Sequence, residues 1–298
     1  VTPVLEDIVL SQRNCRIIAC GDSKQAVYGF RNAKDSLRSP RLRNADTLYL
    51  THSFRFGPRI AATANAILDL AGEKVPVVGL GPADTVVPAK AFSLRHAPTK
   101  DIAFVARTVM GVLQAALFFS KRGLKLHLVG GAEGYNLALL EDLHRLATKQ
   151  RDDIRDKRLL VEFKSWAAYR EMAEQSEDTE MQRAVKIIDS HKNLDHSLQT
   201  LKGSLTERPE DAQLIITTAH RSKGLEFGTV YLLDDFPDVL DPEMEAEDRE
   251  AEVNLLYVAA TRAKRLLAAN KQLGKVLRRA RVPGWEHFST TGRPLTTV

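Results

Sequence analysis

Two hydrophobic patterns alternate along the chain. Short runs rich in β-branched residues are separated by longer segments in which apolar residues recur every three or four positions. This alternation is typical of a parallel sheet with crossover helices, so an α/β fold is expected. Strands are predicted at residues 16–20, 47–50, 102–107, 124–130, 214–219 and 229–235. The clearest helices are predicted at residues 58–72, 111–123 and 254–267.

Two segments interrupt this alternation and indicate domain boundaries. Residues 72–90 are rich in Gly, Pro and Val, which is typical of a linker. Over residues 136–205 the strand patterns vanish and charged helical patterns replace them, which indicates a helical insertion. We therefore expect one sheet domain to end with residues 1–72, and a second to be formed by residues 73–135 and 206–298 around the insertion.

Composition changes this picture little. The chain has 298 residues, enough for two domains, and its 44% hydrophobic and 27% charged content is ordinary for a globular protein. The net charge of +5 suits a polyanionic partner without requiring one. Cys15 and Cys20 flank one predicted strand, so we expect packed thiols in a reducing compartment rather than a disulfide or a metal pair.

The sequence also bears on membrane-spanning and secretory segments, and on the start of the chain. No apolar run approaches the ~20 residues of a membrane span, and no secretory signal opens the sequence. The chain begins at Val1, and Thr2-Pro3 is typical of the start of a helix. We interpret the chain as a fragment or a processed piece that begins inside a domain of a protein that is not secreted.

The first segment with candidate chemistry is "GDSKQAVYGFRNA", residues 21–33, which follows the first predicted strand. Open α/β sheets bind ligands beyond the carboxyl ends of their strands. Gln25 could bind a phosphate or an attacking water, Tyr28 and Phe30 could stack on unpaired bases, and Arg31 could take a backbone phosphate. A turn whose aromatic rings pack in a minor core explains the same residues equally well.

The second segment is "THSFRFGPRIAATANAI". Phe54 could stack on a nucleobase while Arg55 reaches an anionic phosphate. The alternative is a core Phe beside an Arg whose stem covers apolar surface.

The third segment is "TTAHRSKGLEF". Its small and basic residues suit the close approach of a phosphate backbone, and Glu226 could accept hydrogen bonds from ribose hydroxyls. Alternatively, "SKG" is a common turn and His220 is a loop histidine with ordinary partners.

The fourth segment is "EVNLLYVAATRAKRLL". Its apolar residues form the core face of a helix. Thr261 and Arg262 are expected on the same helix, where an Arg on the buried side would need an anion.

In this order, the four segments closely resemble the third to sixth motifs of UvrD-like superfamily 1 DNA helicases, and the resemblance extends from Val1 to about Leu267. "SFRFG" and the later "LLDDF" are most similar to the F-box DNA helicase branch and its bacterial relatives. The resemblance implies RecA-like parallel sheets of the P-loop NTPase type, with a helical insertion. It also implies an ATP-dependent helicase or translocase that moves from 3′ to 5′ on single-stranded DNA in repair or recombination. Such a protein is expected in the cytoplasm or nucleoid of a bacterium, or in the nucleus of a eukaryote.

The resemblance also assigns roles to individual residues. Those that contact the γ-phosphate would be Gln25, Arg55 and Arg262, with Arg262 as the arginine finger. Those that bind the rest of ATP would be Phe54, stacked on adenine, Glu226, on the ribose, and Gly224. Those on the DNA side would be Tyr28, Phe30 and Arg31, with Thr217, His220 and Lys223 linking the DNA to the nucleotide.

The chain departs from the family pattern in several places. Asn32 stands where Gly is usual, Phe54 where Tyr is usual, and Val109 where Asn is common. No G-x-x-x-x-G-K-[ST] sequence occurs, and no Asp-Glu pair precedes the first predicted strand. The ligands of Mg²⁺ are therefore expected upstream, in the other half of the first RecA-like domain, and no metal ligand is assigned within this chain. The chain alone is expected to be inactive, and a non-catalytic nucleic-acid-binding module or a truncated helicase remnant is the alternative.

Overall fold

A computed structural model describes residues 2–27, 35–97, 101–176, 178–191 and 193–285. The chain folds into two units. Unit 1 comprises residues 1–98, 222–232 and 236–298, and unit 2 comprises residues 99–221 and 233–235. Within the described part of the chain, no helix combines the length and the apolar character needed to cross a membrane.

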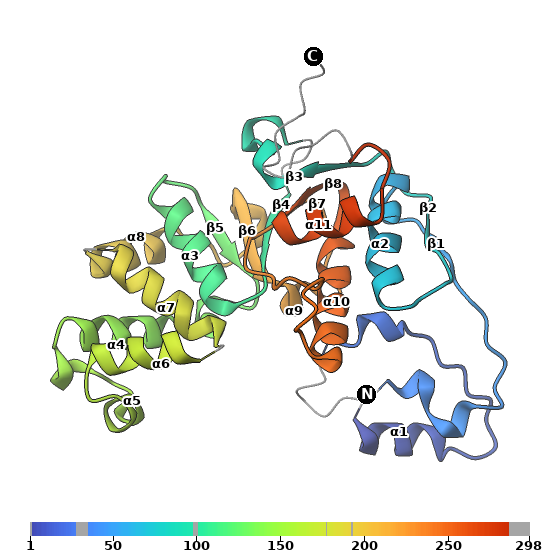
Figure 1. Cartoon of the computed structure of the whole chain (residues 1–298), viewed down its shortest axis with the longest axis horizontal. Coiled ribbons are helices and arrows are strands. Elements are labelled where there is room, and N and C mark those ends of the chain that lie inside the picture. The colour runs from blue at the N-terminus through green and yellow to red at the C-terminus, as the bar shows by residue number, and fades with distance from the viewer. Residues whose placement is uncertain (1, 28–34, 98–100, 177, 192, 286–298) are drawn as a thin grey trace. The chain divides into compact units, whose positions relative to one another are not determined.

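The sheet of unit 1 is parallel and follows the order β3-β8-β7 (Figure 1). These strands are β3 (Thr85–Pro88), β7 (Phe227–Leu232) and β8 (Ala263–Ala269). A separate short parallel pair joins β1 (His52–Ser53) to β2 (Val78–Gly79). Since β8 pairs on both sides, its last residues are buried from both faces, as a central parallel strand requires.

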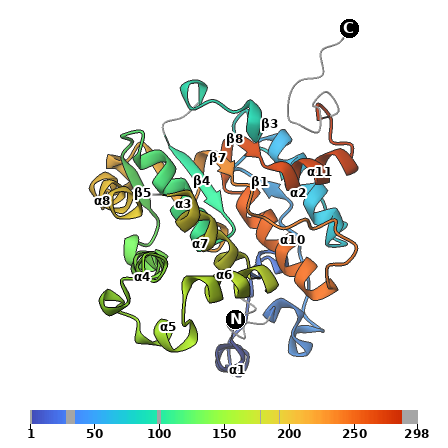
Figure 2. The ribbon, with the colours of Figure 1, turned by 60° about the vertical axis from the view of Figure 1, so that its left-hand side comes forward.

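The helices of unit 1 are α1 (Pro3–Leu10), α2 (Pro58–Leu70), α10 (Ala246–Ala260) and α11 (Lys271–Arg279). Figure 2 shows α2 and α10 as neighbours, and the two helices are in contact. The first turn of α2 is closed by Asp84, whose carboxylate accepts hydrogen bonds from the backbone N–H groups of Arg59 and Ile60, at 3.1 and 2.7 Å. The loop before α2, which carries Arg55, is thereby fixed at its helical end.

The sheet of unit 2 is also parallel and follows the order β4-β6-β5. Its strands are β4 (Ile102–Ala106), β5 (Leu126–Leu128) and β6 (Leu214–Thr218). Helix α3 (Val109–Ser120) packs on them, and the short helix α9 (Ala219–Ser222) follows β6 directly. The N-terminus of α3 is saturated, because Asp235 accepts from the backbone of Thr108 and Glu180 accepts from that of Val109.

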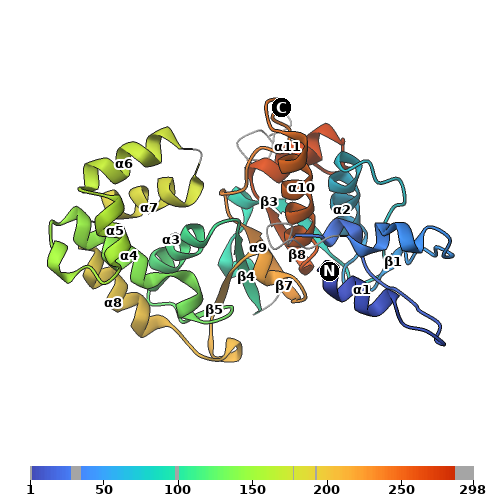
Figure 3. The same cartoon turned by 90° about the horizontal axis from the view of Figure 1, so that it is seen from below.

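The remaining helices of unit 2 lie close together in Figure 3 and confirm the helical pattern predicted for residues 136–205. They are α4 (Leu137–Ala147), α5 (Lys157–Glu162), α6 (Trp166–Gln175), α7 (Thr179–Ser190) and α8 (Leu194–Ser204). Their polar N-caps explain why the sequence begins helices here: Asp156, Ser165, Asp178 and Asn193 each accept a backbone hydrogen bond from the first turn. The domain boundaries proposed from the sequence stay predictions.

The two most N-terminal strand predictions are wrong. Residues 16–20 and 47–50 form no strand, and Ile18 and Leu48 are 84% and 90% exposed. A parallel strand forms only where neighbours supply its hydrogen-bond partners, and no described strand pairs with either run. The expectation of packed thiols is wrong for the same reason, since Cys15 and Cys20 are both exposed.

The prediction of one helix over residues 254–267 is half wrong. Helix α10 ends at Ala260, Thr261 caps it, and residues 263–269 form β8. Pairing with β7 and β3 overrides the helical periodicity of this stretch. Arg262 therefore lies in the turn between α10 and β8 rather than on the helix. The segment 72–90, expected as a linker, likewise contains β2 and β3.

Candidate nucleotide site

Arg262 is the most deeply buried charged side chain of the candidate site. It is 1% exposed and donates hydrogen bonds from Nε to the carbonyl of Val258 at 2.9 Å and from Nη1 to that of Leu225 at 3.3 Å. Its Nη2 lies 3.1 Å from the hydroxyl oxygen of Thr261. Burial, and then the neighbouring charge of Arg55, lower the pKa of Arg262 to about 10. The group is therefore a cation at neutral pH that burial and Arg55 both disfavour.

Arg55 meets the same turn from the loop before α2. Its Nη1 donates to the carbonyl oxygen of Thr261 at 3.1 Å, and its Nε donates to Oε1 of Glu226 at 2.7 Å. Because Thr261 directly precedes Arg262, these bonds bring the predicted pair of arginines into one cluster within unit 1. Arg55 and Arg262 are thus close enough for their charges to interact.

Glu226 supplies negative charge to this cluster. The hydrogen bond from Arg55, with the added charges of Lys264 and Arg262, lowers the pKa of Glu226 below its usual range. The preceding Gly224 has a φ of +87°, a backbone conformation in which glycine is unstrained. Two carboxylates, Glu226 and Asp22, act on the two guanidinium groups, and Lys264 adds a third positive charge. The cations of the cluster therefore outnumber its carboxylates, which favours an added anion.

Gln25 lies in a short 3₁₀ turn, η1 (Ser23–Gln25), that contacts α10. Its side-chain nitrogen donates to Oδ2 of Asp22 at 2.8 Å, and its backbone carbonyl accepts from Nζ of Lys223 at 2.7 Å. The hydroxyl of Tyr257, on α10, donates to the same oxygen of Asp22 at 3.4 Å. The first, third and fourth sequence segments are thus joined by side-chain hydrogen bonds.

Sequence reasoning missed both Asp22 and Tyr257. Asp22 directly precedes the turn that ends at Gln25, and its carboxylate caps this turn by accepting from the backbone N–H of Lys24. This capping role could have been predicted from the sequence. Tyr257 was counted with the apolar face of the helix, and only the fold shows that its hydroxyl reaches Asp22.

Lys24 fixes the 3₁₀ turn from the other side. It is 6% exposed, its Nζ donates to the carbonyl of Ala71 at the end of α2 at 3.1 Å, and it lies 3.9 Å from Glu250 on α10. A cation at a helix C-terminus is favoured by the helix dipole. The turn that carries Gln25 is consequently anchored to both α2 and α10.

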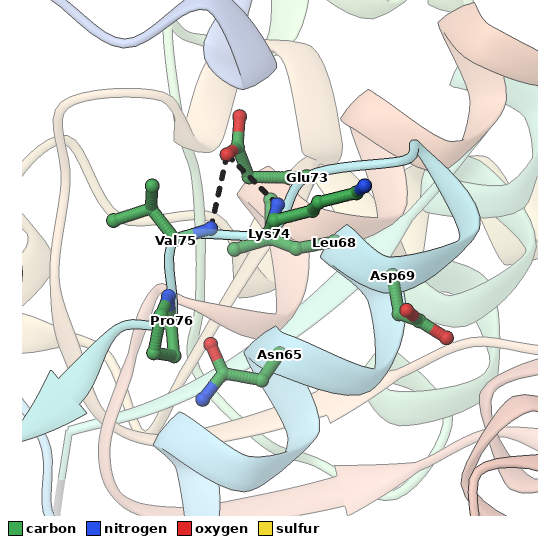
Figure 4. Close-up of a pocket in the computed structure, with 7 residues that line it drawn as sticks. All are labelled: Asn65, Leu68, Asp69, Glu73, Lys74, Val75 and Pro76. Carbon is green, nitrogen blue, oxygen red and sulfur yellow. Dashed lines mark hydrogen bonds between the residues drawn. The ribbon is translucent and has the colours of Figure 1, made fainter.

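A surface hollow near the end of α2 is separate from these residues. Figure 4 shows its lining, which consists of Asn65, Leu68, Asp69, Glu73, Lys74, Val75 and Pro76. The carboxylate of Glu73 is occupied by the backbone N–H groups of Lys74 and Val75, at 3.0 and 3.1 Å. None of the predicted site residues lines this hollow, and its Asn65 and Glu73 side chains bind the backbone of its own loop.

The other predicted residues are placed as follows. Phe54 is 76% exposed beside Arg55. Thr217 and His220 belong to unit 2, where Thr217 is fully buried and His220 has its pKa lowered to about 4 by burial and by Arg107. The predicted DNA contacts Tyr28, Phe30 and Arg31 lie outside the described residues. Within the described ranges, no group of three or more His, Cys, Asp or Glu side chains could hold a metal ion.

Comparison with known proteins extends to the central and C-terminal part. Residues 135–271 match the UvrD-like helicase C-terminal domain. This region is similar to that domain. The match confirms the resemblance, and with the parallel strands it confirms the α/β, RecA-like fold class.

Relatives extend the likeness over nearly the whole chain. F-box DNA helicase 1 of Gallus gallus is 32% identical over 309 residues, covering 96% of this chain and 29% of the relative. F-box DNA helicase protein 1 of Schizosaccharomyces pombe is 29% identical over 295 residues, covering 92% of this chain and 33% of the relative. The chain therefore spans about a third of the length of these curated relatives, and it is related to DNA helicases. The direction of movement and a role in repair stay predictions.

Proposed function

We propose that the chain is the C-terminal portion of an ATP-dependent DNA helicase or translocase, and that the cluster around Arg55 and Arg262 binds the γ-phosphate of ATP. The observation that carries this proposal is the bond between Arg55 and the carbonyl of Thr261, because it holds two guanidinium groups beside one another. Two adjacent cations in a partly buried site are stabilised by a polyanion such as a triphosphate.

The chemistry of phosphoryl transfer suits this arrangement. Catalysis depends mainly on positioned positive charge, and an arginine finger contributes ~10³–10⁵ in rate. Arg262 is held by oxygens of Val258, Leu225 and Thr261, so its guanidinium needs little reorganisation when charge develops on the phosphate. Arg55 is more exposed and would exchange its bond to Glu226 for one to the phosphate.

The remaining roles follow from the resemblance. Phe54 would stack on adenine and Glu226 would bind the ribose, while Thr217, His220 and Lys223 would link the nucleotide to single-stranded DNA. Tyr28, Phe30 and Arg31 would contact the DNA itself. ATP hydrolysis of this kind uses Mg²⁺, and its carboxylate ligands would come from outside this chain.

The test compares Arg262→Ala with Arg265→Ala in the longest natural form of the protein. Arg265 is an exposed arginine of β8 and serves as the matched control. We expect Arg262→Ala to reduce ATP turnover by about 10³-fold or more and to leave single-stranded DNA binding at fixed salt largely intact. Near-normal turnover would remove the assignment of the arginine finger. DNA binding with no ATP turnover in the unsubstituted protein would favour the non-catalytic binding module.

A further inference from the structure

Asp22 caps the turn that carries Gln25, one of the proposed γ-phosphate residues, and accepts hydrogen bonds from three groups. Its Oδ1 accepts from the backbone N–H of Lys24 at 2.9 Å. Its Oδ2 accepts from Nε2 of Gln25 at 2.8 Å and from the hydroxyl of Tyr257 at 3.4 Å. One carboxylate therefore joins the turn that carries Gln25 to the helix that leads to Arg262.

The chemistry of the two groups determines which way the Gln25 amide faces. An ionised carboxylate only accepts hydrogen bonds, whereas an amide donates from its nitrogen and accepts at its oxygen. The NH₂ group of Gln25 must therefore face Asp22, and Oε1 must face away from it. Without such a partner, the two orientations of an amide are nearly equivalent in shape.

We propose that Asp22 is a positioning residue that fixes the amide of Gln25 for catalysis. The proposal rests on the proposed ATP hydrolysis. In this orientation Oε1 is held as an acceptor for a proton of the attacking water, and the second hydrogen of Nε2 is available to a phosphate oxygen. Asp22 itself touches neither the water nor the phosphate.

Further contacts fix the turn that carries Asp22 and Gln25. Lys223 binds the backbone carbonyl of Gln25, and the buried Lys24 ties the same turn to the end of α2. Burial, and then the charge of Asp22, raise the pKa of Tyr257, so its hydroxyl keeps its proton and remains a donor to Asp22. Gln25 is thus held at its backbone by one residue and at its amide by another.

The decisive experiment is a double-mutant cycle between Asp22→Asn and Gln25→Ala, with ATP turnover measured in the longest natural form of the protein. Asparagine keeps the size of Asp22, but its amide can either donate or accept a hydrogen bond. It can therefore pair with the oxygen or the nitrogen of the Gln25 amide, and that amide is no longer held in one orientation. We expect Asp22→Asn to lower kcat about tenfold, the usual scale for loss of an orienting partner, with KM for ATP little changed. Because Asp22 acts through Gln25, the double variant should match Gln25→Ala alone.

Asp35→Asn is the matched control. Asp35 caps the next 3₁₀ turn, Ser36–Arg38, by accepting from the backbone N–H of Leu37 at 3.1 Å, as Asp22 does for its own turn. It should leave kcat unchanged. Additive effects of Asp22→Asn and Gln25→Ala, or a rise in KM with normal kcat, would overturn the positioning role.

A second measurement separates this inference from the proposed function. In the nucleotide-free chain, NMR should show the Gln25 side-chain proton that donates to Asp22 shifted downfield, and Asp22→Asn should abolish that shift. If the unsubstituted protein turns over no ATP, the proposed function and the catalytic role of Asp22 both fail, even where the shift is present. If turnover is normal and the shift is absent, the positioning role alone fails.

Discussion

Arg55 and Glu226 are 171 residues apart in the chain and are joined by a hydrogen bond of 2.7 Å between Nε and Oε1. Both side chains are partly exposed, at 26% and 42%. Glu226 thus binds the guanidinium of Arg55, which in the proposed function binds a phosphate. An incoming phosphate must compete with this internal carboxylate.

Glu226 should weaken the binding of a phosphate chain, because it competes for Arg55, but it should also contribute to the binding of ATP through the proposed ribose contact. Glu226→Gln should increase the affinity of the chain for tripolyphosphate about two- to fivefold, the scale of a partly exposed ion pair. The gain should be smaller for ATP, because the variant also loses the proposed ribose contact. NMR titration at fixed low salt measures both affinities. Glu250→Gln removes the same charge at an exposed position away from Arg55 and controls for net charge.

Arg221 should contribute to the stability of unit 2. Its guanidinium lies over the ring of the fully buried Tyr135, 4.5 Å from the centroid, and donates to the carbonyls of Val129 and Gly134 at 3.3 and 2.7 Å. Arg221→Ala should lower the free energy of unfolding by about 3 kcal/mol, because a ring contact and two hydrogen bonds are lost together. Urea unfolding measures the change.

Arg122 provides the control for Arg221. It also lies over a ring, 3.5 Å from the centroid of Phe118, but in an exposed position. Arg122→Ala should cost no more than about 1 kcal/mol. Equal losses for the two variants would show that burial of Arg221 adds nothing.

Two adjacent glycines distinguish the cost of backbone strain from the cost of a steric clash with Arg221. Gly130 and Gly131 both have positive φ, at +85° and +78°, but a Cβ on Gly130 would lie 2.5 Å from Nη1 of Arg221, whereas one on Gly131 would meet nothing within 4 Å. Gly131→Ala should cost about 1–3 kcal/mol from backbone strain, because its φ of +78° and ψ of 162° are essentially restricted to glycine. Gly130→Ala adds the collision with Arg221 to its own backbone strain. In an Arg221→Ala background Gly130→Ala should become less costly, and an unchanged cost would contradict the contact.

His220 makes the stability of unit 2 depend on pH. Burial and the charge of Arg107 lower its pKa from 6.5 to about 4, so the unfolded state binds more protons between these values. The contribution of His220 is therefore full above pH 6.5 and is lost as the pH falls toward 4. His220→Gln should reduce the difference in unfolding free energy between pH 7 and pH 5. His196→Gln, at an exposed position, should leave that difference unchanged.

Asp142 anchors the helices that follow α3. It is 2% exposed and accepts from Arg145 at 2.7 Å, from the side chain of Arg155 at 3.3 Å, and from two backbone N–H groups. Burial opposes its ionisation, but the backbone N–H groups of Asp156 and Arg155 and the guanidinium groups outweigh burial and lower its pKa. Its stabilising contribution is thus complete above the ordinary pKa of 3.8 and is lost as the pH falls through the lower folded value.

Replacement of Asp142 tests this assignment. Asp142→Asn should destabilise the chain at pH 7 by about 3 kcal/mol, because two arginines lose a buried counter-charge. Asp152→Asn, at an exposed position nearby, should change the unfolding free energy by less than about 0.5 kcal/mol. Urea unfolding of both variants at pH 7 decides the matter, and similar values would show that the buried cluster is not stabilising.

Elements whose signals are local could be predicted from the sequence. The predicted helix at 58–72 and the helical pattern of 136–205 are present because helices satisfy their hydrogen bonds locally and show their buried face as a period. The strands at 102–107 and 214–219 were readable because buried parallel strands are continuously apolar. The identities of Arg55, Glu226 and Arg262 were likewise visible in their motifs.

Which of these residues come into contact could be seen only in the folded chain. Residues 263–269 became a strand because β7 and β3 offered partners on both sides, whereas residues 16–20, with a similar apolar pattern, found none. The hydrogen bonds of Arg55 to Glu226, and of Tyr257 to Asp22, join segments 171 and 235 residues apart. Local periodicity encodes burial, but the choice of a distant partner depends on how the whole chain packs.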